Sequence, residues 1–140
     1  MVDKALFSSA TCEWSTPQDL FDRLDKIYHF TLDVCATKEN TKCKKFFSKK
    51  SDGLSKDWAG NMCWCNPPYG RGITEKWVKK AWDESGNGDT TVVMLLPSRT
   101  DTKWFHSYCQ KDSIEFIKGR LKFGGSKNPA PFPSMIVVFK

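Results

Sequence analysis

The residues Asn66-Pro67-Pro68-Tyr69 form the segment of this chain best suited to chemistry. Asn66 carries a side-chain carbonyl, Pro67 a backbone carbonyl and Tyr69 a flat aromatic face, and the two adjacent prolines stiffen the backbone between them. Two hydrogen-bond acceptors beside an aromatic ring suit a planar base with an exocyclic amino group, because the amine can donate two hydrogen bonds while its ring stacks. The segment therefore predicts a site for a nucleobase amine.

The hydrophobic pattern around this segment predicts the elements that must position it. Thr16 is expected to cap a helix that starts at Pro17 and continues to Tyr28, and Asp19 would complete the cap. Further helices are expected over residues 75–85 and around 104–108, and strands over residues 30–35, 62–65, 91–96, 114–117 and 135–139. Strands alternating with helices predict an α/β fold with a mixed, mostly parallel sheet, helices on both faces and a C-terminal strand that could fold back antiparallel. Ligands of such sheets bind beyond the carboxyl ends of the strands, where Asn66 follows a strand.

Length and composition limit the function classes. The 140 residues, 39% of them hydrophobic, fit one domain over residues 1–140, without a separate target-recognition domain. The net charge of +6 favours a polyanionic partner such as a nucleic acid. No apolar run approaches the roughly 20 residues that span a bilayer, and no secretory core segment is found at the N-terminus, so membrane and secreted proteins are disfavoured.

Metal chemistry and histidine catalysis are not expected. The Cys63 and Cys65 side chains would point to the same face of a strand, but their spacing does not match a CxxC zinc hairpin. The six cysteines are better interpreted as small thiols in a reducing compartment, so we expect no metal ligand. His29 at a helix end and His106 within a helix are expected to be structural or exposed.

Several segments, in order along nearly the whole chain, resemble the phage-type DNA N6-adenine methyltransferase family. Besides the (D/N/S)PPY motif at residues 66–69, the resemblance rests on Glu13-Trp14-Ser15-Thr16-Pro17, Leu32-Asp33-Val34-Cys35-Ala36, Asp52-Gly53-Leu54, residues 95–102, residues 119–125 and Pro131-Phe132-Pro133-Ser134. The resemblance implies a single Rossmann-like domain that transfers a methyl group from S-adenosylmethionine to the N6 amino group of adenine in DNA. It also implies work in the cytoplasm of a bacterial host cell if a phage encodes the chain.

The resemblance also implies roles for individual residues. Asn66, Pro67, Pro68 and Tyr69 would be catalytic, and the residues expected at S-adenosylmethionine are Trp14, Thr16, Pro17, Asp33, Cys35, Ala36, Asn40, Asp52, Leu54 and Asn66. Thr16 and Pro17 would lie near the methionine end, Asp52 and Leu54 near the adenine, and Asn40 near the ribose. Without the neighbouring matches, Asp52-Gly53 would be interpreted as an ordinary turn and Thr16-Pro17 as an ordinary helix start. The chain departs from methyltransferases at large because no glycine-rich loop follows Asp33.

DNA is the expected partner, either single-stranded or as a duplex from which the target base is flipped out. Arg71, Arg99 and Arg120 could reach phosphates, although Arg99 and Arg120 could equally pair with Asp101 or Glu115. A lysine-rich stretch over residues 37–51, around the apolar pair Phe46-Phe47, could track phosphates or form a solvated face. We expect either modest sequence specificity or recognition supplied by loops or by the second subunit of a homodimer.

Two other classes of function remain open from the sequence. The same motif could present its acceptors to cytosine N4, to an RNA base or to a glutamine amide. A catalytically inactive nucleic-acid-binding module would also explain the basic charge and the missing glycine loop, but such a module has no need for Asn66.

Overall fold

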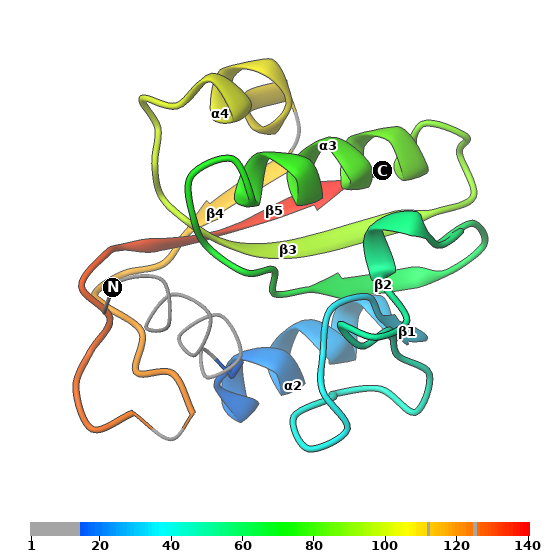
Figure 1. Cartoon of the computed structure of the whole chain (residues 1–140). Helices are drawn as coiled ribbons and strands as arrows, with labels where there is room; N and C mark the ends of the chain where they lie inside the picture. The colour runs from blue at the N-terminus through cyan, green and yellow to red at the C-terminus, as the bar shows by residue number, and fades with distance from the viewer. Residues whose placement is uncertain (1–14, 112, 125) are drawn as a thin grey trace.

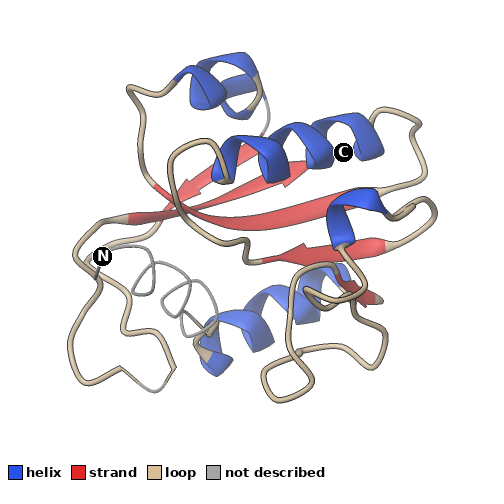
Figure 2. Ribbon diagram, in the orientation of Figure 1, coloured by secondary structure: helices blue, strands red, loops and turns tan. Residues whose placement is uncertain are grey.

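The computed structural model describes residues 15–111, 113–124 and 126–140 (Figure 1). A mixed five-stranded sheet is flanked by helices (Figure 2). The elements in chain order are α2 (Gln18–Tyr28), β1 (Leu32–Asp33), the 3-10 helix η1 (Gly53–Ser55), β2 (Met62–Cys65), α3 (Thr74–Ser85), β3 (Thr91–Pro97), α4 (Lys103–Ser107), the 3-10 helix η2 (Cys109–Lys111), β4 (Ser113–Phe116) and β5 (Ser134–Phe139).

The strands lie in the order β1-β2-β3-β5-β4. β1, β2 and β3 are parallel, with Cys63 of β2 opposite Leu32 of β1 and Val92 of β3. β5 is antiparallel to both of its neighbours, β3 and β4. The predicted fold-back of the C-terminal strand is therefore confirmed. The crossover between β2 and β3 is made by α3, because parallel strands cannot be joined by a tight turn.

Alternating side chains of the sheet build two apolar layers. Val92 and Met94 of β3 belong to a buried cluster that includes residues of α3 and α4, whereas Val93 and Leu95 belong to a cluster that includes residues of α2. Figure 1 shows α3 and α4 on one side of the sheet and α2 on the other. Because β3 is buried on both faces, its sequence is a nearly continuous apolar run.

The start of α2 differs from the prediction. The helix begins at Gln18, and Pro17 occupies the cap position without a side-chain hydrogen bond. In the first turn, Asp19 Oδ1 accepts from the Leu20 amide at 2.9 Å. The hydroxyl oxygen of Thr16 instead accepts hydrogen bonds from Trp64 Nε1 at 3.2 Å and Asn66 Nδ2 at 3.1 Å. A hydroxyl oxygen has two lone pairs, and these two donors use both. The prediction that Thr16 caps α2 is therefore wrong.

β1 is shorter than the strand predicted over residues 30–35. It comprises Leu32 and Asp33, and Asp33 also forms an isolated parallel bridge with Phe46. The Asp33 amide donates to the carbonyl of Lys45, and the Asp33 carbonyl accepts from the amide of Phe47. Residues 45–47 therefore lie beside Asp33 and take up the hydrogen bonds of the sheet edge.

The cysteines of β2 both belong to the cluster that packs against α3, as their alternation predicted. Burial raises the pKa of the Cys63 thiol to about 12 and also raises that of the Cys65 thiol well above its ordinary value. Among the described residues, no three His, Cys, Asp or Glu side chains are grouped as a metal site would require. None of the helices in the described part of the chain is long and apolar enough to cross a bilayer.

Candidate active site

The carboxyl ends of four strands meet at one edge of the sheet. β1, β2 and β3 are parallel, and β4 has the same direction because β3 and β4 are both antiparallel to β5. The loop after β1, residues 66–69 after β2, the turn after β3 and the segment after β4 all leave from this edge. Ligands of open α/β sheets bind at such an edge.

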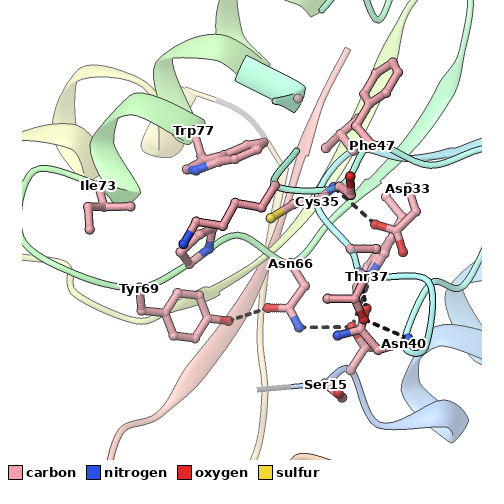
Figure 3. Close-up of a pocket in the computed structure, with 18 of the residues that line it drawn as sticks. Ser15, Asp33, Cys35, Thr37, Asn40, Phe47, Asn66, Tyr69, Ile73 and Trp77 are labelled. Carbon is pink, nitrogen blue, oxygen red and sulfur yellow. Dashed lines mark hydrogen bonds between the residues drawn. The ribbon is translucent and has the colours of Figure 1, made fainter. Parts of the chain in front are cut away.

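A cavity of about 590 Å³ lies at this edge (Figure 3). Its volume is within the range of roughly 300–1,000 Å³ that small-molecule and cofactor sites occupy. The wall brings together most of the residues expected at the site, namely Thr16, Asp33, Cys35, Ala36, Asn40, Asp52, Asn66, Pro68, Tyr69 and Arg71. These residues come from distant parts of the sequence, so the fold, and not the motif alone, assembles this wall.

The Asn66 side chain is held at both ends of its amide group. Its Nδ2 donates to Thr16 Oγ1 at 3.1 Å. Its Oδ1 accepts from the Tyr69 hydroxyl at 3.1 Å, as Figure 3 shows. The same Tyr69 hydroxyl lies 3.0 Å from the carbonyl oxygen of Leu95 in β3. The amide is therefore oriented by the loop before α2, by the motif and by the neighbouring strand.

The two prolines of the motif have different surroundings. Pro67 is buried and does not line the cavity, whereas Pro68 does. The Pro68 carbonyl accepts from the Thr74 hydroxyl at 3.3 Å, and that hydroxyl also accepts from the Gly70 amide at 3.1 Å. Thr74 begins α3, so these bonds tie the end of the motif to the first turn of the following helix.

The Asp33 carboxylate organises the loop after β1, where a glycine-rich loop is missing. Oδ1 accepts from the Cys35 amide at 3.4 Å and Oδ2 from the Lys42 amide at 3.0 Å. Burial raises the pKa of Asp33 to about 6, because desolvation outweighs the lowering effect of these amide donors. A buried carboxylate thus fixes the loop that lines the cavity.

Within the same loop, Thr37 and Asn40 bind one another reciprocally. The Thr37 amide donates to Asn40 Oδ1 at 2.7 Å, and the Asn40 amide donates to Thr37 Oγ1 at 3.1 Å. Asn40 lines the cavity, but its amide oxygen already accepts a hydrogen bond from the backbone. This turn gives Asn40 a structural role beside the ribose contact expected of it.

Asp52 and Gly53 form a close backbone approach at the cavity wall. Asp52 has a φ of 59°, in the left-handed region that aspartate tolerates better than most residues. A Cβ atom on Gly53 would lie 2.2 Å from the carbonyl oxygen of Val34 and 3.1 Å from the Trp77 ring. No larger residue fits between these groups, so Asp52-Gly53 is more than an ordinary turn.

Several apolar residues of the wall were not among the expected site residues. They include Phe47, Ile73 and Trp77, which line the cavity together with the polar residues. Ile73 and Trp77 are four residues apart, a spacing that places side chains on the same side of a helix, and this signal was available in the sequence. Phe47 belongs to the apolar pair in the lysine-rich stretch, which marked it as unusual without indicating a cavity.

Some expected cofactor residues lie elsewhere. Leu54 packs against the core on the α3 side of the sheet, and Pro17 accepts the first hydrogen bond of α2 from the Phe21 amide at 3.1 Å. Neither residue lines the cavity. Trp14 lies outside the described residues.

A family model described as DNA N-6-adenine-methyltransferase (Dam) matches residues 5–140. This chain belongs to that Dam family. It is similar to the DNA N-6-adenine-methyltransferase of Haemophilus phage HP1 (strain HP1c1), with 34% identity over 137 residues that cover 91% of this chain and 78% of the relative. It is also similar to the DNA N-6-adenine-methyltransferase of Escherichia phage T1, with 37% identity over 106 residues that cover 74% of this chain and 43% of the relative.

The three arginines that were expected to contact DNA all lie on the surface. Arg71 is exposed and lines the cavity. Arg99 and Arg120 are also exposed, and they follow β3 and β4 at the same edge of the sheet. Glu115, one of the two acidic partners considered for them, forms its ion pair with Arg23 of α2 at 2.8 Å. Among the ion pairs of the described residues, none involves Arg99 or Arg120.

Proposed function

We propose that this chain transfers a methyl group from S-adenosylmethionine to the N6 amino group of adenine in DNA. The observation that carries the proposal is the Asn66 amide, which two hydroxyl groups hold at the wall of a cavity of about 590 Å³. Membership of the Dam family supports adenine as the base and DNA as the polymer. We also assign the chain to the Rossmann-like class, as a single methyltransferase domain, because its parallel strands carry the cavity at their carboxyl ends.

The residues of the cavity wall fit the chemical groups of S-adenosylmethionine. Asp33 and Asp52 offer acceptors to amino and hydroxyl groups, Thr16 offers a hydroxyl to the methionine end, and Phe47 and Trp77 offer apolar surface to a purine ring. Cys35, Ala36 and Asn40 complete this side of the wall. When bound, the cofactor supplies an electrophilic methyl group on a sulfonium.

The chain's own residues must make the adenine amine reactive. The lone pair of this nitrogen is delocalised into the ring, so the amine is a poor nucleophile. A hydrogen bond accepted by Asn66 Oδ1 would favour a pyramidal nitrogen, and this bond strengthens as positive charge develops on the amine. The Pro67 carbonyl was expected as a second acceptor, but Pro67 does not line the cavity. The Tyr69 ring lines the cavity beside Asn66 and offers its face to the base. No general base is needed before transfer, since the proton can leave afterwards.

The target base must leave its stack to reach this wall. Duplex DNA with an extruded adenine and single-stranded DNA both meet that requirement. Arg71 at the cavity and Arg99 and Arg120 at the same sheet edge would hold the phosphates beside the target. Sequence recognition would come from loops or from the partner in a homodimer.

Methyl transfer from radiolabelled S-adenosylmethionine to unmodified DNA, followed by mass spectrometry of the nucleosides, tests the proposal. We expect N6-methyladenine with the wild type and a large loss with Asn66→Ala. Parallel reactions with RNA and with a glutamine peptide examine the other acceptors. N4-methylcytosine, methylated RNA or a methylated peptide in place of N6-methyladenine would overturn the assignment of the acceptor.

The inactive binding module is tested by calorimetry with S-adenosylmethionine. We expect the wild type to bind the cofactor. If the wild type binds DNA but does not bind S-adenosylmethionine at millimolar concentration, the chain is a nucleic-acid-binding module and not a methyltransferase.

A further inference from the structure

Each end of the Asn66 amide has a hydroxyl partner. Thr16 Oγ1 accepts from Nδ2, and the Tyr69 hydroxyl donates to Oδ1, both at 3.1 Å. An amide can rotate about its last side-chain torsion, whose profile is broad and roughly two-fold. Such a rotation would exchange an acceptor for a donor and would turn an N–H group toward the amine that must be bound. A partner at each end opposes that rotation.

Thr16 is a rigid partner because the core holds it in place. Its side chain is 5% exposed, and its hydroxyl oxygen also accepts from Trp64 Nε1 at 3.2 Å. The Trp64 ring is in turn packed edge-on against Phe21 of α2, with the ring centroids 5.6 Å apart. The Thr16 hydroxyl does not cap α2, and the core instead holds it in position for Asn66.

Tyr69 has one hydroxyl proton and two acceptors within reach. Asn66 Oδ1 lies 3.1 Å and the Leu95 carbonyl oxygen 3.0 Å from its hydroxyl oxygen. The ring is held edge-on by Phe132 and Phe123, at centroid distances of 5.5 and 6.5 Å. Burial raises the pKa of Tyr69 well above its ordinary value, so the group remains a proton donor at all working pH values.

We propose that Thr16 and Tyr69 are positioning residues that fix the orientation of the Asn66 amide, and that Tyr69 gives up its bond to Asn66 when the target amine arrives. Before the amine binds, the Tyr69 hydroxyl donates its proton to Asn66 Oδ1 in a hydrogen bond. When the amine donates to Oδ1, rotation about the phenol C–O bond directs the proton to Leu95, and no heavy atom has to move. The inference rests on the proposed function for its catalytic consequence, but the orientation of the amide can be measured without it.

Tyr69→Phe tests the proposal because it removes the hydroxyl and keeps the ring. We expect the single-turnover rate of methyl transfer to fall about 10-fold or more, as for a lost transition-state interaction, with DNA and cofactor affinities nearly unchanged. In an Asn66→Ala background the same substitution should cause no further loss, since Tyr69 acts through Asn66. Losses that multiply in the double variant, or an unchanged rate in Tyr69→Phe, would overturn the proposal.

Thr16 is tested by a pair of substitutions. Thr16→Val removes the hydroxyl and should slow transfer, whereas Thr16→Ser retains it and should restore the rate. Equal rates in these two variants would contradict a role for the hydroxyl. Tyr108→Phe is the matched control for Tyr69→Phe, because Tyr108 packs against Trp82 and does not line the cavity, so its rate should equal that of the wild type.

An NMR measurement separates this inference from the proposed function. The Nδ2 protons of Asn66 should be protected from exchange with water in the wild type and less protected in Tyr69→Phe and Thr16→Val. Unchanged protection in folded Tyr69→Phe would overturn the inference even if the enzyme methylates DNA. If the wild type methylates nothing but the Asn66 Nδ2 protons still lose protection in Tyr69→Phe and Thr16→Val, the inference about the amide stands and the proposed function is rejected.

Discussion

At the scale of single residues, the oxygen of Asn66 is the atom whose removal should be most costly to the reaction. Asn66→Ala deletes an acceptor that acts mainly in the transition state, so we expect turnover to fall by about 10²-fold or more. Single-turnover methyl transfer measures the loss, and circular dichroism confirms that the fold survives. Asn66→Asp is the matched control because it keeps an acceptor oxygen. Similar rates for the alanine variant and the wild type would remove Asn66 from the mechanism.

A second prediction at this scale concerns Asp33 and pH. Its pKa is raised by burial to about 6 in the folded protein, from an ordinary value of 3.8. Between these values the folded state binds a proton that the unfolded state has lost, so the contribution of Asp33 to the free energy of unfolding rises as the pH falls from 7 toward 4. The difference in pKa corresponds to about 3 kcal/mol at full titration.

Denaturant unfolding of the wild type and of Asp33→Asn at several pH values measures this contribution. The variant should lack it, so the wild type should gain stability relative to Asp33→Asn as the medium is acidified through pH 6. Parallel stability curves would show that the carboxylate does not titrate in this window.

At the scale of elements, the contact between η1 and the loop that follows β1 depends on the absence of a side chain at residue 53. Gly53→Ala would place a Cβ 2.2 Å from the Val34 carbonyl oxygen, so the backbone must shift. We expect a loss of about 1–3 kcal/mol in the free energy of unfolding and weaker cofactor binding, because Asp52 moves with the backbone. Gly86→Ala is the control, since its nearest neighbour would be at 3.5 Å, and thermal unfolding compares the two.

The elements that carry residues 66–69 could be predicted from local pattern. β2 has the predicted bounds, and α3 begins one residue before the predicted start, because the alternation of Cys63 and Cys65 and the helical spacing of Trp77, Val78 and Ala81 are local signals. The hydrogen bonds of the Thr16 hydroxyl could not be predicted, because its partners Trp64 and Asn66 are 48 and 50 residues away. Local propensity favours a cap, and the tertiary contacts override it.

The polar part of the cavity was predictable to the extent that the family resemblance named its residues. The apolar part was not, since an aromatic side chain such as Trp77 on an amphipathic helix is equally well explained as core. Trp77 is only 7% exposed and stacks on Trp58, so it belongs to the core and the cavity wall at once. The packing of α3 against the strands shows that Trp77 has both roles, and this packing cannot be inferred from the helical pattern.

At the scale of the whole molecule, the net charge of +6 should make DNA binding depend on salt. Arg71→Ala should weaken binding to all sequences alike and reduce the slope of log affinity against log salt concentration by about one, the change expected for one lost phosphate contact. Fluorescence anisotropy with a labelled duplex measures the slope. Lys26→Ala, which is exposed in the last turn of α2, is the control. Identical slopes for Arg71→Ala and the wild type would remove Arg71 from the phosphate contacts.

The position of β5 has a consequence for biosynthesis. β5 is the last of the five strands along the chain, yet it lies between β3 and β4 inside the sheet. A nascent polypeptide from which β1 to β4 have already emerged still lacks β5, the strand that joins β3 to β4. Ribosomes must therefore complete β5 before the sheet can close, and we expect a message cut short upstream of β5 to yield a product in which β3 and β4 stay separate.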